Sequence, residues 1–367
     1  MLPVLQGLRE VLALPISAVD AINPALRHTK EQLLHPFRAA EWAKLAFVGF
    51  LAGELSSGGC NGSSFQTPGN PRGGQSLPLP HLNNLLLYAS LIALLIVVAV
   101  VLWIVFLYVS SVMRFILFDS VIAKRCEIRL GWARRHGAGL RYFVWQLVFI
   151  LAMFVGLTVL VGIPAAFAFA AGWLKDPRHH MIPLILGGIF LFFVVIGFIL
   201  LSLVVHVLTK DFVVPEMALE NVTAFEGWRR LLPRLRSEKG SYAGYLGMKI
   251  VMAVAASVAV GILTVIVVLI LLIPVGGFGV VAVILGKTAG LTWNLYTITL
   301  AVVIGCIALA VLLYVIALIS VPTIVFFPAY SIYFFASRYP PLDALLHPPP
   351  IALEVLAPPL PPPEPIG

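Results

Sequence analysis

Asp119 and Glu216 are the acidic residues best placed in this sequence to do chemistry. Each lies four residues after a phenylalanine, Phe115 or Phe212, in a charged stretch next to a long apolar segment. Two carboxylates can act as general acid and base when a nucleophile, a second base or a metal lies nearby. The neighbouring residues supply arginines instead. An ion pair with these arginines is therefore the favoured interpretation, and a catalytic pair is the alternative.

Other patterns that carry chemistry are weak. His179 and His180 are adjacent, but no third ligand of the right kind follows, and zinc takes three or four protein ligands. Cys60, Cys126 and Cys306 are far apart and form no CxxC. No P-loop, HExxH or GxSxG motif occurs in the sequence. We therefore predict a protein that is not an enzyme, with no catalytic residue, no cofactor and no metal site.

The elements that carry these residues are expected to be transmembrane helices. Hydrophobic residues make up 60% of the 367 residues and charged residues 11%, against about 45–50% and about 25% in soluble proteins. Apolar runs of about 20 residues match the hydrocarbon thickness of a bilayer, where the backbone must form helices or a closed barrel. Barrel strands alternate in polarity and these runs do not. The sequence predicts an all-α polytopic transmembrane helix bundle with about six spans.

The chain divides into three expected parts. Residues 1–40 form a cytoplasmic arm, either amphipathic and lying on the membrane or simply soluble. Residues 41–338 form the membrane domain, with interfacial loops at 114–141 and 209–247. Residues 339–367 form a proline-rich disordered tail whose PxxP spacings suit a partner domain. The predicted spans are about 41–54, 85–113, 142–172, 181–208, 248–274 and 294–320.

The sequence does not decide the extent of two of these predicted spans. The segment 41–54 is short for a crossing, which takes about 17–25 residues. The apolar run 250–286 is interrupted at Pro274 and fits either one span or two. Pro164 interrupts another span, and both prolines are candidate helix breaks. Breaks of this kind line substrate sites in some transporters, and more often they only kink a helix.

The basic residues indicate the orientation. With both termini in the cytoplasm, 20 of the 24 Lys and Arg residues fall in cytoplasmic segments, and only Arg72, Lys175, Arg178 and Lys287 fall outside. Cytoplasmic loops carry such an excess. We therefore predict a multi-pass protein of the bacterial or archaeal cytoplasmic (inner) membrane. The net charge of +8 then needs no nucleic-acid partner.

The two charged loops resemble each other. In both, a phenylalanine and a carboxylate are followed by Gly-Trp and a group of arginines. This pattern predicts an internal repeat of an interfacial helix and a helical hairpin; convergence of two unrelated loops is the alternative. Tryptophan favours headgroup depth and arginine meets phosphate there, so membrane lipids, anionic lipids among them, are the expected partners, together with another membrane or cytoplasmic protein. The predicted contact residues are Trp132, Arg134, Arg135, Trp228, Arg229 and Arg230.

The N-terminal stretch, with Ala18–Ile22, Pro36–Arg38 and Trp42–Ala46, together with the repeated loops, resembles a group of prokaryotic membrane proteins. One branch of that group is the membrane domain of glycerophosphoryl diester phosphodiesterases. The resemblance implies a six-helix inner-membrane protein of unknown function. It does not imply phosphodiesterase activity, which belongs to a separate barrel domain.

Three functions are compatible with these features. A non-enzymatic membrane protein that organises lipids or partners agrees best with the basic loops and the absent motifs. A transporter or channel-like protein for a small or amphipathic substrate is the alternative, favoured by the repeat and the two prolines. An enzyme acting on lipid comes third, on the two carboxylates alone.

Overall fold

The computed structural model describes residues 15–54, 85–173, 179–288 and 295–347. This part of the chain contains helices and the turns between them, with no strand. The all-α fold class is therefore confirmed. In chain order, the helices are α2 (Ile22–Leu34), α3 (Ala39–Leu51), α4 (Leu85–Ala123), α5 (Ile128–Ala170), α6 (Met181–Leu208), the π-helix η3 (Thr209–Val213), α7 (Val214–Glu220), α8 (Ala224–Ser237), α9 (Lys239–Thr288), α10 (Leu295–Ile319), α11 (Val321–Ala336) and α12 (Pro340–Leu346).

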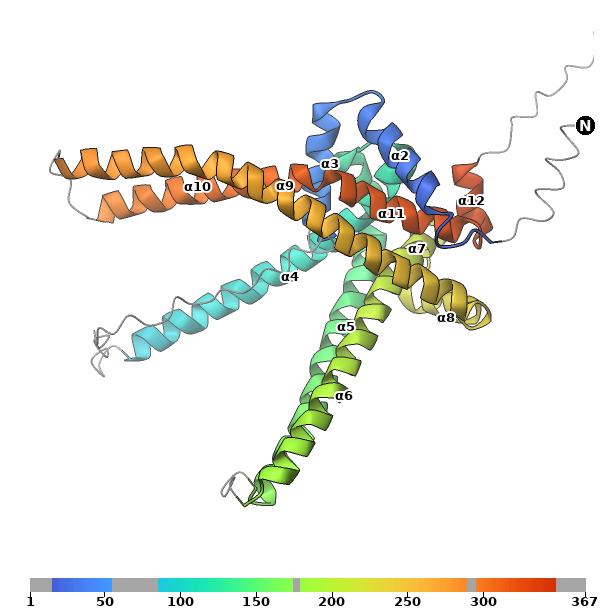
Figure 1. Ribbon diagram of the computed structural model, residues 1–367, viewed down its shortest axis with the longest axis horizontal. Coiled ribbons are helices and arrows are strands. Elements are labelled where there is room, and N and C mark those ends of the chain that lie inside the picture. The colour runs from blue at the N-terminus through green and yellow to red at the C-terminus, as the bar shows by residue number, and fades with distance from the viewer. Residues whose placement is uncertain (1–14, 55–84, 174–178, 289–294, 348–367) are drawn as a thin grey trace, which may run out of the picture.

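Five helices of the described chain, α4, α5, α6, α9 and α10, are long and apolar enough to cross a membrane. They are arranged as three legs that spread from a common base (Figure 1): α4 alone, α5 beside α6, and α9 beside α10. Their apolar parts carry almost no buried residue. Since no water satisfies backbone groups in hydrocarbon, such stretches are stable as helices with lipid-facing side chains. The prediction of a polytopic helical membrane protein is confirmed.

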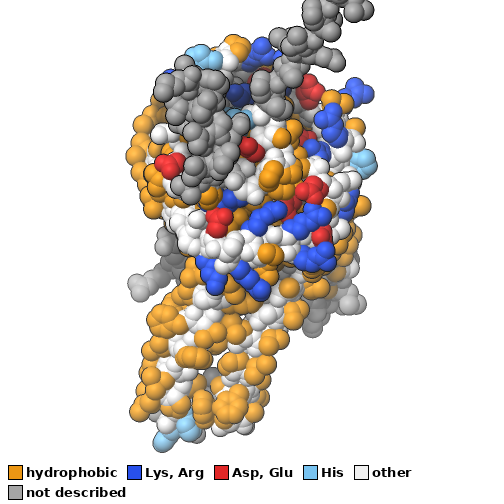
Figure 2. Space-filling view, turned by 90° about the vertical axis from the view of Figure 1, so that its right-hand side faces the viewer, with side chains coloured by type: hydrophobic (Ala, Val, Ile, Leu, Met, Phe, Trp, Pro, Cys, Tyr) orange, Lys and Arg blue, Asp and Glu red, His pale blue; other side chains and the backbone are white. Residues whose placement is uncertain are grey.

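We call the common base the hub. It consists of α2, α3, η3, α7, α8, α11 and α12, with the adjoining ends of the five long helices. Its buried hydrophobic residues come from four stretches, 21–52, 112–142, 208–245 and 317–342. Charged side chains gather on the hub, whereas the leg that extends below it in Figure 2 is covered by hydrophobic side chains. The hub therefore has the composition of a soluble domain, and the legs that of membrane spans.

The exposed length of α4 fits a bilayer. Residues 89–106 are exposed along their whole length, and 18 residues of α-helix measure about 27 Å. This is close to the roughly 30 Å of bilayer hydrocarbon. From Ser110 onward, α4 is buried in the hub. The exposed part of α4 is therefore long enough to cross the hydrocarbon, and the rest of the helix packs in the hub.

Helix α3 overlaps the predicted span at 41–54 but is shorter than a crossing requires. It has 13 residues, which is about 20 Å of helix and too short for the hydrocarbon. Leu45, Ala46 and Val48 are buried, because α3 packs on α4, α10 and α11 within the hub. A Cβ placed on Gly49 would come 2.5 Å from the side chain of Ile324, so glycine permits this close packing. The apolar residues that suggested a span form part of the hub core instead.

Both candidate helix breaks, Pro164 and Pro274, lie within continuous helices. Helix α5 continues through Pro164 to Ala170, and α9 runs without interruption through position 274 to Thr288. Proline removes one backbone hydrogen bond from a helix. In surroundings without water, the remaining bonds have no competitor and the helix persists. The run 250–286 is accordingly one helix.

The predicted loops and arm take a different form in the structure. Residues 114–123 are the straight end of α4, and α5 begins at Ile128, so this region is a helical hairpin inside the hub. Helix α2 packs on α11 in the hub rather than lying apart as an arm. Residues 1–14 and 348–367, with most of the predicted tail, lie outside the described residues, as does Cys60.

Candidate functional site: a buried charge cluster at the base of the legs

Four ionisable residues converge where the legs enter the hub. They are Arg114 on α4, Lys210 and Asp211 on η3, and Lys249 on α9, joined by Glu54 after α3. Asp211 and Glu54 are 3% exposed and Arg114 is 8% exposed. Charged groups are buried at such depth only when they are paired. We name these five residues the root cluster.

Two ion pairs bind the root cluster together. Lys210 pairs with Glu54, and Lys249 pairs with Asp211. The Oη of Tyr245 also donates to Oδ2 of Asp211, at 2.9 Å. Because these pairs join η3 to the end of α3 and to α9, they fasten two of the legs to the hub. The π-helical turn lies at this junction, and such turns are frequent at functional sites.

Arg114 is the cation of the root cluster without a carboxylate partner. Its Nη1 donates to Oη of Tyr142 at 2.7 Å and its Nη2 to the carbonyl oxygen of Ala52 at 3.0 Å. Its Nε is buried and has no hydrogen-bond partner in the described chain. Arginine stays protonated at all relevant pH values, so the root cluster holds three cations and two carboxylates.

A cavity of about 30 Å³ adjoins the root cluster, lined by Glu54, Arg114, Lys210 and Asp211 with the side chain of Ser331 and apolar residues. Burial raises the pKa of the Glu54 carboxyl, but the charges of Lys210 and Arg114 outweigh it and hold the pKa below its usual value. The group therefore stays ionised. The cavity has room for a water or a small ion and none for an organic substrate, whose pockets measure roughly 300–1,000 Å³.

Asp119 and Glu216, the two carboxylates singled out in the sequence, lie in the hub outside the root cluster, and each pairs with a different arginine. Asp119 forms a bidentate ion pair with Arg135, with both distances at 2.7 Å. Glu216 pairs with Arg234 on α8. Both contacts agree with the favoured interpretation as ion pairs, while Oε2 of Glu216 is buried without a hydrogen-bond partner among the described residues.

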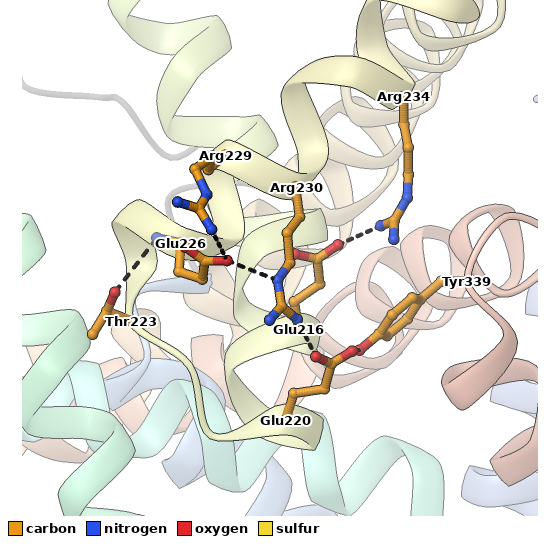
Figure 3. Close-up of polar contacts among 8 residues, drawn as sticks. All are labelled: Glu216, Glu220, Thr223, Glu226, Arg229, Arg230, Arg234 and Tyr339. Carbon is orange, nitrogen blue, oxygen red and sulfur yellow. Dashed lines mark hydrogen bonds and ion pairs between the residues drawn. The ribbon is translucent and has the colours of Figure 1, made fainter.

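Helix α8 carries a second polar network (Figure 3). Thr223 caps this helix by accepting from the backbone N–H of Glu226. Glu226 in turn accepts from Arg229 at 3.0 Å and Arg230 at 3.1 Å. Arg230 also pairs with Glu220, the last residue of α7. Tyr339 donates to the same carboxylate from the start of α12. The network therefore joins α7, α8 and the C-terminal part of the hub.

The sequence matches a family of unknown function, DUF7544, over residues 16–345. The chain belongs to this family. The matched residues run from the N-terminal edge of the hub to α12, so the family comprises the hub and the legs together. No curated protein and no solved structure matches this DUF7544 chain. Nothing in these comparisons supports the resemblance to the membrane domain of glycerophosphoryl diester phosphodiesterases.

The arginines and tryptophans predicted to meet lipid have different surroundings in this DUF7544 member. Trp228 donates through Nε1 to Oγ1 of Thr209 at 3.0 Å, and the ring of Trp132 packs edge-on against Tyr108. Three of the four predicted arginines, Arg135, Arg229 and Arg230, are in ion pairs. Arg134 is exposed and has no hydrogen bond or ion pair with a described residue.

The root cluster was not singled out in the sequence, although a signal for it exists. Arg114, Lys210 and Lys249 are each the charged residue next to a long apolar run. A lysine in that position ordinarily extends towards the headgroups. Which carboxylates pair with these cations depends on how α3, η3 and α9 meet, and this arrangement is not visible in local sequence.

Proposed function

We propose that this protein is a non-enzymatic organiser of the membrane, which holds lipids or a partner membrane protein between and around its legs. One observation carries the proposal: the apolar surfaces of the legs are open along the length of a bilayer, while the base of every leg is packed into one hub. A protein that only needed a compact bundle would bury these surfaces against one another. Lipid or foreign transmembrane helices therefore have direct access to them.

The polar sites support a structural role. The carboxylates Asp119 and Glu216 are each paired with an arginine, and the cavity at the root cluster is too small for an organic substrate. No group of three or more His, Cys, Asp or Glu side chains in the described residues has the arrangement of a metal site. The paired carboxylates and the small volume of this cavity are the support for the proposal.

Purification in mild detergent tests the proposal. We expect native mass spectrometry to find specific lipids or a partner protein bound at fixed stoichiometry. A preparation that carries only the lipid mixture of the membrane extract, and no other protein, would contradict it.

A transport function remains the alternative because of one cavity. It measures about 430 Å³, lies between α5 and α6, and is lined by Pro164, Trp173, Gly187 and Gly188 among apolar side chains. Its lining suits the acyl chain of an amphipathic substrate rather than a polar solute. Flux of such a compound in proteoliposomes, abolished by Gly188→Trp, would favour transport over the organising role.

We also propose that the hub faces the cytoplasm of a bacterial or archaeal cell. It carries α2 and α12, so both ends of the described chain lie on one side. The excess of basic residues in the hub segments favours the cytoplasm for this side.

Cysteine labelling tests this orientation. Cys126 is 1% exposed and would resist reagent from either side, so a new cysteine is needed in a cysteine-free background. His136→Cys on the hub should react with an impermeant thiol reagent only after the membrane is opened. His179→Cys, exposed at the far end of the α5–α6 leg, should react in intact spheroplasts. The reverse pattern would place the hub outside.

Anionic lipid is the partner that we propose for the basic face of the hub. Arg125 and Arg134, both exposed, line a groove of about 140 Å³ between the end of α4 and the start of α5, together with Glu127 and with Asp119, which is paired with Arg135. In the described chain neither arginine of the groove forms an ion pair, whereas Arg229 and Arg230 share Glu226. A lipid phosphate can therefore be held at this groove without breaking an internal pair.

The arginine pairs provide matched variants for this lipid. Arg125→Gln with Arg134→Gln should weaken retention of phosphatidylglycerol or cardiolipin by roughly fivefold for each arginine removed, because a basic residue near an anionic surface contributes about 1 kcal/mol. Arg229→Gln with Arg230→Gln removes the same charge and should change retention much less. Native mass spectrometry of both variants measures the difference. Equal loss in the two would show that only total charge matters.

A further inference from the structure

The root cluster holds three cations and two carboxylates, so it carries one positive charge in excess. Lys210 and Lys249 are each in direct contact with a carboxylate, whereas Arg114 donates to a phenol oxygen and a backbone carbonyl and shares the negative charges of Glu54 and Asp211 with the two lysines. An uncompensated buried charge is strongly destabilising. A lysine in this position would avoid the cost of a buried charge by losing its proton, whereas an arginine keeps its proton. A neutralising group is therefore expected next to Arg114.

The cavity beside Arg114 is the place for such a group. Arg114 lines it and is more than nine-tenths buried, and the buried Nε of its guanidinium has no hydrogen-bond partner in the described chain. Lys210 lines the same cavity. We propose that this cavity binds one small monovalent anion of the size of chloride. The anion completes the charge balance of the root cluster.

The size and the charge of the cavity select this ligand class. A volume of about 30 Å³ admits one or two water-sized particles, which excludes a phosphate ester or an organic acid. Water would fill the cavity but would not balance the excess positive charge of the root cluster. A metal cation would meet three positive side chains against two carboxylates, both of which already have a lysine partner. The carboxylates of Glu54 and Asp211 also line the cavity and repel an anion. Binding of the anion therefore depends on the one positive charge in excess.

This binding would connect the ion composition of the solution around the hub to the way the legs are held. The lining residues come from α4, η3, α7 and α11 and from the end of α3. An anion bound there stabilises the assembled hub and not the unfolded chain. The inference is independent of the organising role and of its lipid, since the cavity is internal to the hub.

The test compares chloride with gluconate at constant ionic strength in detergent-purified protein. Chloride should raise the midpoint of thermal unfolding by roughly 2–4 °C for each tenfold increase above its dissociation constant. Equilibrium dialysis with radioactive chloride should find about one ion for each chain. Arg114→Met should remove both effects, and Arg129→Gln, a change of one exposed charge near the start of α5, should preserve them.

Two results would overturn the proposal. The first is the same unfolding midpoint in chloride and gluconate with no chloride bound to the wild-type protein, which would assign the cavity to water. The second is unchanged chloride binding in Arg114→Met, which would place the ion elsewhere. If Arg114→Met fails to fold, dialysis with the wild-type protein still decides, and a bromide peak in anomalous diffraction locates the site.

Discussion

Replacing Lys249 by methionine is expected to lower the free energy of unfolding of the hub by about 3–5 kcal/mol, the usual cost of removing one partner of a buried ion pair. The side chain of Asp211 is 3% exposed and that of Lys249 is 11% exposed. In the variant, Asp211 would keep only the hydrogen bond from Tyr245. Since η3 and α9 are joined here, the loss should appear as earlier detachment of the α9–α10 leg. Denaturant unfolding in detergent, followed by tryptophan fluorescence, measures it.

Two further variants show whether an unpaired buried charge causes this loss. Lys249→Met combined with Asp211→Asn removes both charges and should be more stable than Lys249→Met alone. Lys124→Met breaks an exposed pair with Glu31, whose side chains are 43% and 45% exposed, and should cost less than about 1 kcal/mol. If the double variant is no more stable than Lys249→Met, lost packing and not the charge explains the effect.

The membrane class of this protein is readable from its sequence because hydropathy is a local property. An apolar run of 20 residues specifies a span wherever it occurs, and the long helices α4, α5, α6, α9 and α10 all begin from such runs. The segment at 41–54 fails this rule because apolar residues also build soluble cores. Leu45 and Val48 are buried on a helix that packs against α4, α10 and α11, and nothing in the local sequence distinguishes contact with these helices from contact with lipid.

The polar sites are less accessible to sequence analysis because pairing is long-range. Asp119 and Arg135 are 16 residues apart across one hairpin. Because they are close in the sequence, an ion pair between them could be expected. Glu54 and Lys210 are separated by 156 residues, and their pairing requires the hub to be assembled. The sequence pattern likewise predicted the same lipid contact for Arg134 and Arg135. Consecutive residues of an α-helix point about 100° apart, and only Arg135 reaches Asp119.

The hairpin of α4 and α5 gives the second large effect. A Cβ built on Gly139 would lie 2.5 Å from Cγ2 and 3.0 Å from the Cα of Val112. Glycine therefore lets the two backbones approach, as small residues do between packed helices. Gly139→Ala should push α4 from α5 and destabilise the hub by about 1–3 kcal/mol, the cost of overpacking a filled interface. Chemical denaturation of the variant and the wild type measures the difference.

Gly137, two residues earlier on the same helix, provides a control of opposite sign. Nothing lies within 4 Å of a Cβ at this position, so Gly137→Ala should stabilise α5 by about 0.5–1 kcal/mol through helix propensity alone. Combining Gly139→Ala with Val112→Ala removes the nearest clashing atom but keeps the 3.0 Å approach to the backbone, and should restore only part of the loss. If Gly139→Ala and Gly137→Ala both stabilise the protein, α4 and α5 are further apart than the contact between Gly139 and Val112 requires. A loss at position 139 alone shows instead that glycine sets the spacing at which Arg114 reaches Tyr142, because both pairs of residues lie on these two helices.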